Sequence, residues 1–94
     1  LLAEMTREHC RGADLTLLTS TRFGLGCMLD QPDVANATYG LGPQSFGHPG
    51  AGGSVGFADP EREVAFGFVT NSLGPYVLMD PRSQRLATVL GECL

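Results

Sequence analysis

The chain contains no lysine, and all six of its basic side chains are arginines. The arginines are scattered along the 94 residues, and the formal net charge is −4. Proteins that bind nucleic acid neutralise phosphates with a stripe of basic side chains, so we do not expect nucleic acid as a partner. No apolar run reaches the length needed to cross a bilayer, so the sequence predicts no membrane span.

Metal-binding side chains are also scarce. His9 and His48 are the only histidines, and they have no partner at ligand spacing. The three cysteines, Cys10, Cys27 and Cys93, match no zinc-binding spacing. We therefore predict neither a metal site nor another cofactor. The cysteines are interpreted as small buried hydrophobic residues, with a reactive thiol or a disulfide as the alternatives.

Apolar alternation predicts an antiparallel sheet. Residues 22–29 and 64–71 alternate large apolar side chains with mostly Gly or Ala, which is typical of strands. Residues 45–59 are predicted to be extended, and the charged DPERE turn joins them to 64–71 as a hairpin. Residues 1–10 resemble the end of a helix, and 30–44 a long loop. We interpret the acidic residues of DPERE as a solvated turn.

The last fifteen residues carry the clearest helix signal. Asp80 is suited to the N-cap and Pro81 to the first helical position, where its missing N–H is not needed. The fold class predicted is α+β: three antiparallel strands of a larger sheet, closed by a C-terminal helix. A Gly/Ala sheet face allows very close packing, so we expect 1–94 to be one segment of a longer domain. The predicted apolar stripe of the helix consists of Leu86, Val89, Leu90 and Cys93.

The stretch FGHPGAGGSVGFADPE holds five glycines and is the candidate functional segment. Residues 47–54 approach the phosphate-binding pattern G-x-x-x-x-G-K-[ST], but Gly53 stands in the place of the lysine. Residues 52–56 match the nucleophile-elbow pattern G-x-S-x-G, which places Ser54 as nucleophile but requires a helix to follow. Here a strand is predicted to follow. Glycines that serve only turns and close packing are a further alternative.

The order of TRFGLGCML, FGHPGAGGSVGFADPE, EVAFGFVTN and a terminal helix resembles a known family. It is similar to the C-terminal portion of the serine β-lactamase and penicillin-binding-protein superfamily, in the class C-like branch of β-lactamase-related serine hydrolases and esterases. The third active-site motif of that superfamily is usually K-T-G, and esterase-like members carry H-x-G. The matching residues here are His48-Pro49-Gly50. The resemblance is most specific over residues 45–71.

The resemblance implies a partial site. An S-x-x-K motif cannot lie in a chain without lysine, and Tyr39-Gly40-Leu41 is not Y-x-N, so the other two motifs are expected elsewhere. By the resemblance, the Ala51 N–H would stabilise the oxyanion of an acyl-transfer transition state. Loss of such a donor costs about 2.7–4 kcal/mol. Gly50 would give the nucleophile room, and His48 would face the cleft and handle protons.

These expectations describe a parent serine hydrolase that acts through an acyl-enzyme, with the present chain inactive alone. Histidine in place of lysine removes a permanent cation, which favours ester or amide substrates over β-lactams. Two alternatives remain. The parent could be a non-catalytic binding or scaffolding protein of the same fold, or the chain could be a free-standing small domain. If the parent is a hydrolase or a scaffolding protein, the remainder of the domain is the expected partner of this chain.

Overall fold

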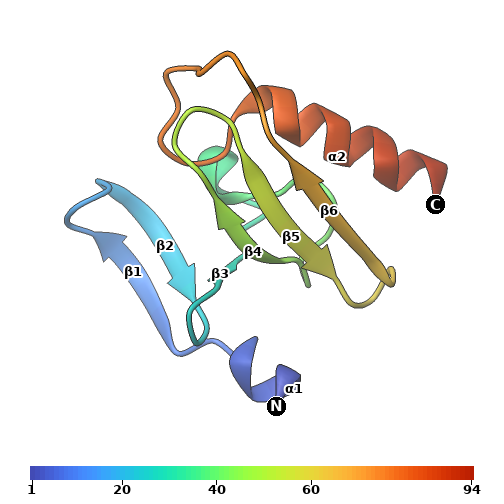
Figure 1. Ribbon diagram of the computed structural model, residues 1–94. Coiled ribbons are helices and arrows are strands. Elements are labelled where there is room, and N and C mark those ends of the chain that lie inside the picture. The colour runs from blue at the N-terminus through green and yellow to red at the C-terminus, as the bar shows by residue number, and fades with distance from the viewer.

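A computed structural model describes residues 1–94 (Figure 1). One six-stranded antiparallel sheet runs in chain order, β1-β2-β3-β4-β5-β6, and a C-terminal helix lies across one of its faces. The predicted α+β class is therefore confirmed, with six strands rather than three. No helix is long and apolar enough to cross a membrane. The elements are α1 (Leu2–Met5), β1 (Cys10–Asp14), β2 (Thr19–Phe23), β3 (Met28–Leu29), η1 (Ala35–Ala37), β4 (Phe46–Pro49), β5 (Val55–Asp59), β6 (Val64–Phe68) and α2 (Pro81–Cys93).

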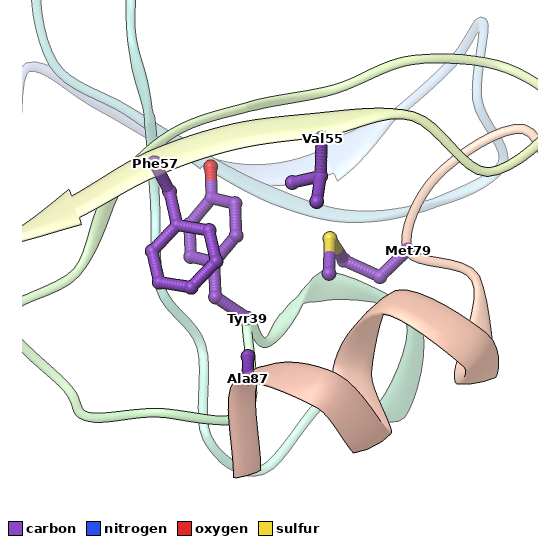
Figure 2. Packing of buried hydrophobic residues seen from close by; sticks show 5 residues of the cluster. All are labelled: Tyr39, Val55, Phe57, Met79 and Ala87. Atoms are coloured by element: carbon purple, nitrogen blue, oxygen red, sulfur yellow. The ribbon is translucent and has the colours of Figure 1, made fainter. Parts of the chain in front are cut away.

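The two faces of strands β4 to β6 have different covers. The core face carries Val55 and Phe57, which are about 95% buried, and the phenol ring of Tyr39 stacks on Phe57 with ring centroids 4.7 Å apart. Met79 and Ala87 close this cluster from the side of α2 (Figure 2). Burial of such side chains stabilises a fold by about 1.5–3 kcal/mol each. The core therefore holds the sheet and α2 together.

The opposite face of the same strands is lined by small residues. Gly56 of β5 pairs directly with Gly67 of β6, and a Cβ at either position would meet no atom within 4 Å. The neighbouring row pairs Ala58 with Ala65. His48 pairs with Gly56, so its side chain lies on this open face and is exposed. The predicted Gly/Ala face therefore exists, and His48 stands at its margin.

Helix α2 begins as predicted but turns a different side toward the sheet. The side chain of Asp80 caps the helix by accepting a hydrogen bond from the Arg82 backbone N–H, and Pro81 takes the first position. The buried residues are Ser83 and Ala87, and the hydroxyl of the adjacent Thr88 donates to the Gly40 carbonyl at 3.0 Å. The predicted apolar stripe is wrong as a core contact, because its members are exposed or only half-buried: Leu86, Val89, Leu90 and Cys93.

The predicted strand 22–29 is wrong, because the chain reverses within it. The Gly24 N–H donates to the Cys27 carbonyl at 2.9 Å, and Gly26 has a φ of +76°, a left-handed conformation that favours glycine. This turn pairs Phe23 with Met28 in adjacent strands. The side chains of residues 22–29 therefore do not alternate between the two faces.

Two further hairpins differ from the sequence prediction. Residues 10–23 form the β1–β2 hairpin, although no strand was predicted before residue 22. Residues 45–59 are not one extended run, because β4 and β5 pair with each other across the turn at 50–54. The helix predicted over 1–10 spans only Leu2–Met5. Gly50, Gly52 and Gly53 of the candidate segment therefore lie in a turn that closes a hairpin within the sheet.

The charged turn between β5 and β6 was correctly placed but is not wholly solvated. Asp59 is fully buried, and its Oδ1 accepts hydrogen bonds from the backbone N–H groups of Glu61 and Arg62. Its Oδ2 accepts from the Arg62 guanidinium at 3.1 Å and from the Ser45 hydroxyl at 3.4 Å. A buried carboxylate needs such partners. Asp59 therefore organises the turn from inside.

Candidate functional site

His48 presents one ring nitrogen to the open face. Its Nδ1 lies 2.6 Å from the carbonyl oxygen of Pro49, the next residue. A carbonyl oxygen only accepts hydrogen bonds, so Nδ1 is the donor of this pair, which leaves Nε2 as the other ring nitrogen. The Phe23 ring lies beside the imidazole, with centroids 6.2 Å apart. Nε2 is therefore the ring nitrogen of His48 that makes no hydrogen bond within the chain.

The turn that follows His48 leaves the backbone N–H of Ala51 unpaired. The Gly50 N–H donates to the Ser54 carbonyl at 2.7 Å, and the Gly53 N–H donates to the Gly50 carbonyl at 3.2 Å. The Ala51 N–H has no hydrogen-bond acceptor within the chain. In a trans peptide the N–H points opposite to the preceding C=O. The Gly50 carbonyl points into the turn toward Gly53, so the Ala51 N–H points out of it.

The start of helix α2 contacts this turn through the side chain of Arg82, which is ion-paired with Asp80. The Arg82 guanidinium donates to the Gly52 carbonyl at 3.0 Å and to the Ser72 carbonyl at 2.9 Å. It also donates to both carboxylate oxygens of Asp80, at 2.8 and 3.1 Å. The Asp80 side chain is 1% exposed and that of Arg82 is 44% exposed. The hydrogen bonds from Arg82 hold the pKa of the Asp80 carboxyl below its usual value.

The same turn is fitted closely to its surroundings. Gly52 and Gly53 have φ of +99° and +125°, which side-chain-bearing residues rarely adopt. A Cβ on Gly53 would lie 2.8 Å from an Arg82 guanidinium nitrogen and 3.0 Å from a carboxylate oxygen of Asp80. The Gly52 N–H donates to the Tyr76 carbonyl at 2.8 Å. Both glycines are therefore required by conformation and by space.

The predicted site residues lie together, and the alternative nucleophile Ser54 lies in the same hairpin. His48, Gly50 and Ala51 all belong to the β4–β5 hairpin, at the end of β4 and in its turn. A Cβ on Gly50 would sit 3.4 Å from the Ser54 Cβ, so Gly50 also suits the hairpin itself. Ser54 leads into strand β5 and not into a helix, so the nucleophile-elbow geometry is not met.

Tyr39 takes no part in this hairpin. It is 1% exposed, and its hydroxyl donates to the Met28 carbonyl at 2.9 Å within the core. Burial, with a smaller contribution from the Asp30 carboxylate, raises the pKa of its phenol. The neutral phenol is therefore a structural group of the core.

Two depressions in the surface are relevant to ligand binding. One of about 350 Å³ is bordered by His48, Gly50 and Ser54. A more polar one of about 430 Å³ lies elsewhere, between Arg22 and Asp30. Arg22 there already donates to the Glu8 carboxylate and the Asp30 carbonyl. No group of three His, Cys, Asp or Glu side chains is placed to hold a metal ion.

Sequence reasoning did not find the contact between Arg82 and the glycine turn. Asp80 was identified only as a helix cap, and Arg82 was given no role. The contact joins residues 30 positions apart, and no spacing rule relates them. The only local signal was the conformational demand of two adjacent glycines beside His48.

Known proteins resemble this chain in both sequence and structure. It is 56% identical over 68 residues to "Esterase/beta-lactamase LipL" of Mycobacterium tuberculosis, covering 71% of this chain and 14% of the relative. A penicillin-binding protein homolog from Caulobacter crescentus superposes with a TM-score of 0.89 at 39% identity. A family VIII carboxylesterase superposes with a TM-score of 0.85 at 35% identity. Each solved structure matches 99% of this chain, which spans 24% of either one.

The match extends to a whole protein family. The family model described as Beta-lactamase matches residues 1–89. This range contains the six-stranded sheet, the β4–β5 hairpin with His48, and most of α2. The chain therefore belongs to the Beta-lactamase family, within the superfamily of serine β-lactamases and penicillin-binding proteins.

Proposed function

We propose that this chain forms one wall of the active site of a longer serine hydrolase that cleaves esters through an acyl-enzyme. The observation that carries the proposal is the unpaired Ala51 N–H, three residues beyond His48 on one hairpin. The kinship to proteins named as an esterase/β-lactamase and a carboxylesterase supports the hydrolase assignment. The nucleophilic serine and its lysine partner would come from outside these 94 residues.

Each residue of the hairpin has a role in this proposal. Negative charge develops on the substrate carbonyl oxygen during acyl transfer, and a fixed backbone donor stabilises it without reorganising. The Ala51 N–H is such a donor, because the turn already fixes its direction. The Nε2 of His48 accepts or returns a proton during acylation and deacylation. Gly50 keeps the strand end free of a side chain where the substrate approaches.

The imidazole also shapes the choice of substrate. A lysine at this position would offer a permanent cation to the carboxylate that β-lactams carry, whereas a neutral histidine would not. The substrate class proposed is therefore a small ester or amide, with β-lactams as poorer substrates. Comparison of kcat/KM for a p-nitrophenyl ester and a chromogenic cephalosporin tests this order.

We further propose that the remainder of the domain covers the open Gly/Ala face. Gly56 and Gly67 leave room there for very close packing of another element. Leu86 and Val89 of α2 are 47% and 55% exposed and offer a second apolar contact. Exposed apolar surface of this kind is typical of an interface.

A pair of histidine variants tests the proposed function in the full-length protein. His48→Ala should lower kcat for a p-nitrophenyl ester at least about tenfold, because it removes the proton-handling group. His9→Ala is the matched control, because the hydrogen bond and ion pair of the His9 side chain are both with Glu4, so this variant should leave kcat unchanged. An unchanged rate in His48→Ala would remove His48 from the site. Absence of ester hydrolysis and of fluorophosphonate labelling would favour a non-catalytic binding or scaffolding protein.

A further inference from the structure

Arg82 is the charged side chain that hydrogen-bonds to the glycine turn, and most of its donors are already in use. Four hydrogen bonds run from its guanidinium to Gly52, Ser72 and Asp80. A guanidinium has five N–H groups, so little donor capacity remains for a substrate. The Asp80 carboxylate also neutralises its charge. This arrangement suits a residue that fixes other groups and does not bind an anion itself.

The connection from Arg82 to the Ala51 N–H runs through three residues. Arg82 and the Gly74 N–H, at 2.8 Å, both donate to the Gly52 carbonyl and so occupy its lone pairs. The adjacent Gly53 rests against the guanidinium and donates its N–H to the Gly50 carbonyl. That carbonyl belongs to the same rigid peptide unit as the Ala51 N–H. The direction of this N–H therefore depends on where Arg82 holds the turn.

We propose that Arg82, supported by Asp80, is a positioning residue that aims the Ala51 N–H at the developing oxyanion. The inference rests on the proposed function, because the oxyanion exists only if the protein performs acyl transfer. A donor displaced from its place loses much of the transition-state stabilisation that preorganisation supplies. Substrate binding in the ground state uses this donor less. The loss of Arg82 should consequently appear in kcat more than in KM.

The test compares Arg82→Gln with Arg85→Gln in the full-length protein. Both variants remove one positive charge from α2, but Arg85 is exposed and makes neither a hydrogen bond nor an ion pair. Arg82→Gln should lower kcat for a p-nitrophenyl ester about tenfold, with KM changed less than about twofold. Arg85→Gln should match the wild type. Arg82→Lys keeps the charge and one donor direction, and should recover part of the lost kcat.

Amide hydrogen exchange supplies a readout that does not depend on activity. In Arg82→Gln the amides of Gly52 and Gly53 should exchange about tenfold faster than in Arg85→Gln, while the amides of β5 keep their protection. Equal exchange rates in the two variants would contradict the inference that Arg82 fixes the position of the turn. Faster exchange with an unchanged kcat would overturn its role in catalysis. If the wild type hydrolyses no ester, the proposed function fails, and the exchange comparison still decides whether Arg82 positions the turn.

Discussion

Substitution of Gly53 by alanine should destabilise the full-length protein, because this position combines an unfavourable φ with a tight contact. Gly53 has a φ of +125°, and residues with a Cβ lose roughly 1–2 kcal/mol in the left-handed region. The added Cβ would also lie 2.8 Å from an Arg82 nitrogen and 3.0 Å from the Asp80 carboxylate. Both distances are shorter than ordinary van der Waals contact, so the ion pair would have to move.

The contact term can be estimated from the hydrogen bonds that such a movement weakens. Displacing Arg82 loosens its bond to the Gly52 carbonyl, and a hydrogen bond from a charged group contributes about 1.5–3 kcal/mol. Arg82 is 44% exposed, so water screens this bond and the lower end of the range applies. Together with the φ term, we expect Gly53→Ala to lower the free energy of unfolding by about 2–4 kcal/mol.

Gly26→Ala is the control that isolates the φ term. Gly26 has a φ of +76°, but a Cβ there would meet no atom within 4 Å. The free energies of unfolding of the two variants, measured in urea, should therefore differ by at least about 1 kcal/mol, with Gly53→Ala the less stable. Combining Gly53→Ala with Arg82→Ala should reduce this difference, because the shorter side chain removes the contact. If Gly53→Ala destabilised no more than Gly26→Ala, the close fit of the turn against α2 would be refuted.

Two further predictions concern exposed surface and pH. The isolated 94-residue chain should bind a hydrophobic dye and self-associate, because Leu86, Val89 and the Gly/Ala face lack cover; a sharp monomeric melt without dye binding would contradict this. The pKa of Asp80 is lower in the folded state than in the unfolded state. The ionised Asp80 carboxylate therefore stabilises the fold above about pH 4, and this contribution is lost as the pH falls through the folded-state pKa. Asp80→Asn should flatten the loss of unfolding free energy between pH 6 and 3, and a pH dependence equal to that of the wild type would contradict this role of Asp80.

Helix α2 could be predicted because its start is encoded locally. An aspartate N-cap followed by proline sets the helix start without help from the rest of the fold. Its orientation could not be predicted in the same way. The helix buries Ser83 and Ala87, of which Ala87 packs into the core cluster with Tyr39, while Leu86 is exposed. The rule that the apolar stripe faces the core fails where other apolar surface remains to be covered.

The strands were harder to predict where burial does not alternate along the chain. Strand β1 is exposed over most of its length and β2 is half-buried apart from the buried Thr21, so neither shows an apolar alternation in sequence. Its turn is stabilised by the Asp14 carboxylate, which accepts hydrogen bonds from the N–H groups of Thr16 and Leu17. Leu18 in this turn has a φ of +57°, and no turn-forming dipeptide in the sequence indicates this conformation. Alternation over 22–29 was real in sequence, but the left-handed Gly26 permits a reversal that periodicity does not register.

The candidate site divides in the same way between local and distant information. His48-Pro49-Gly50-Ala51 is a contiguous motif, so its residues could be named from sequence. The hydrogen-bonded ring nitrogen of His48 and the unpaired Ala51 N–H needed coordinates, because they depend on which carbonyl each group meets. The Arg82 contact needed the whole fold.

The glycines of the candidate segment have two separate physical causes. Gly52 and Gly53 have positive φ and press against Leu73 and the Asp80–Arg82 pair, so they serve the turn from inside this chain. Gly56 lies in regular strand with open space above it, so nothing within the chain requires it to lack a side chain. A glycine in mid-strand weakens the strand, and close approach of another backbone is one reason for its presence. Gly52 and Gly53 thus fit a turn that fixes the direction of a backbone donor. Gly56 fits the close approach of another element of the domain to the open face.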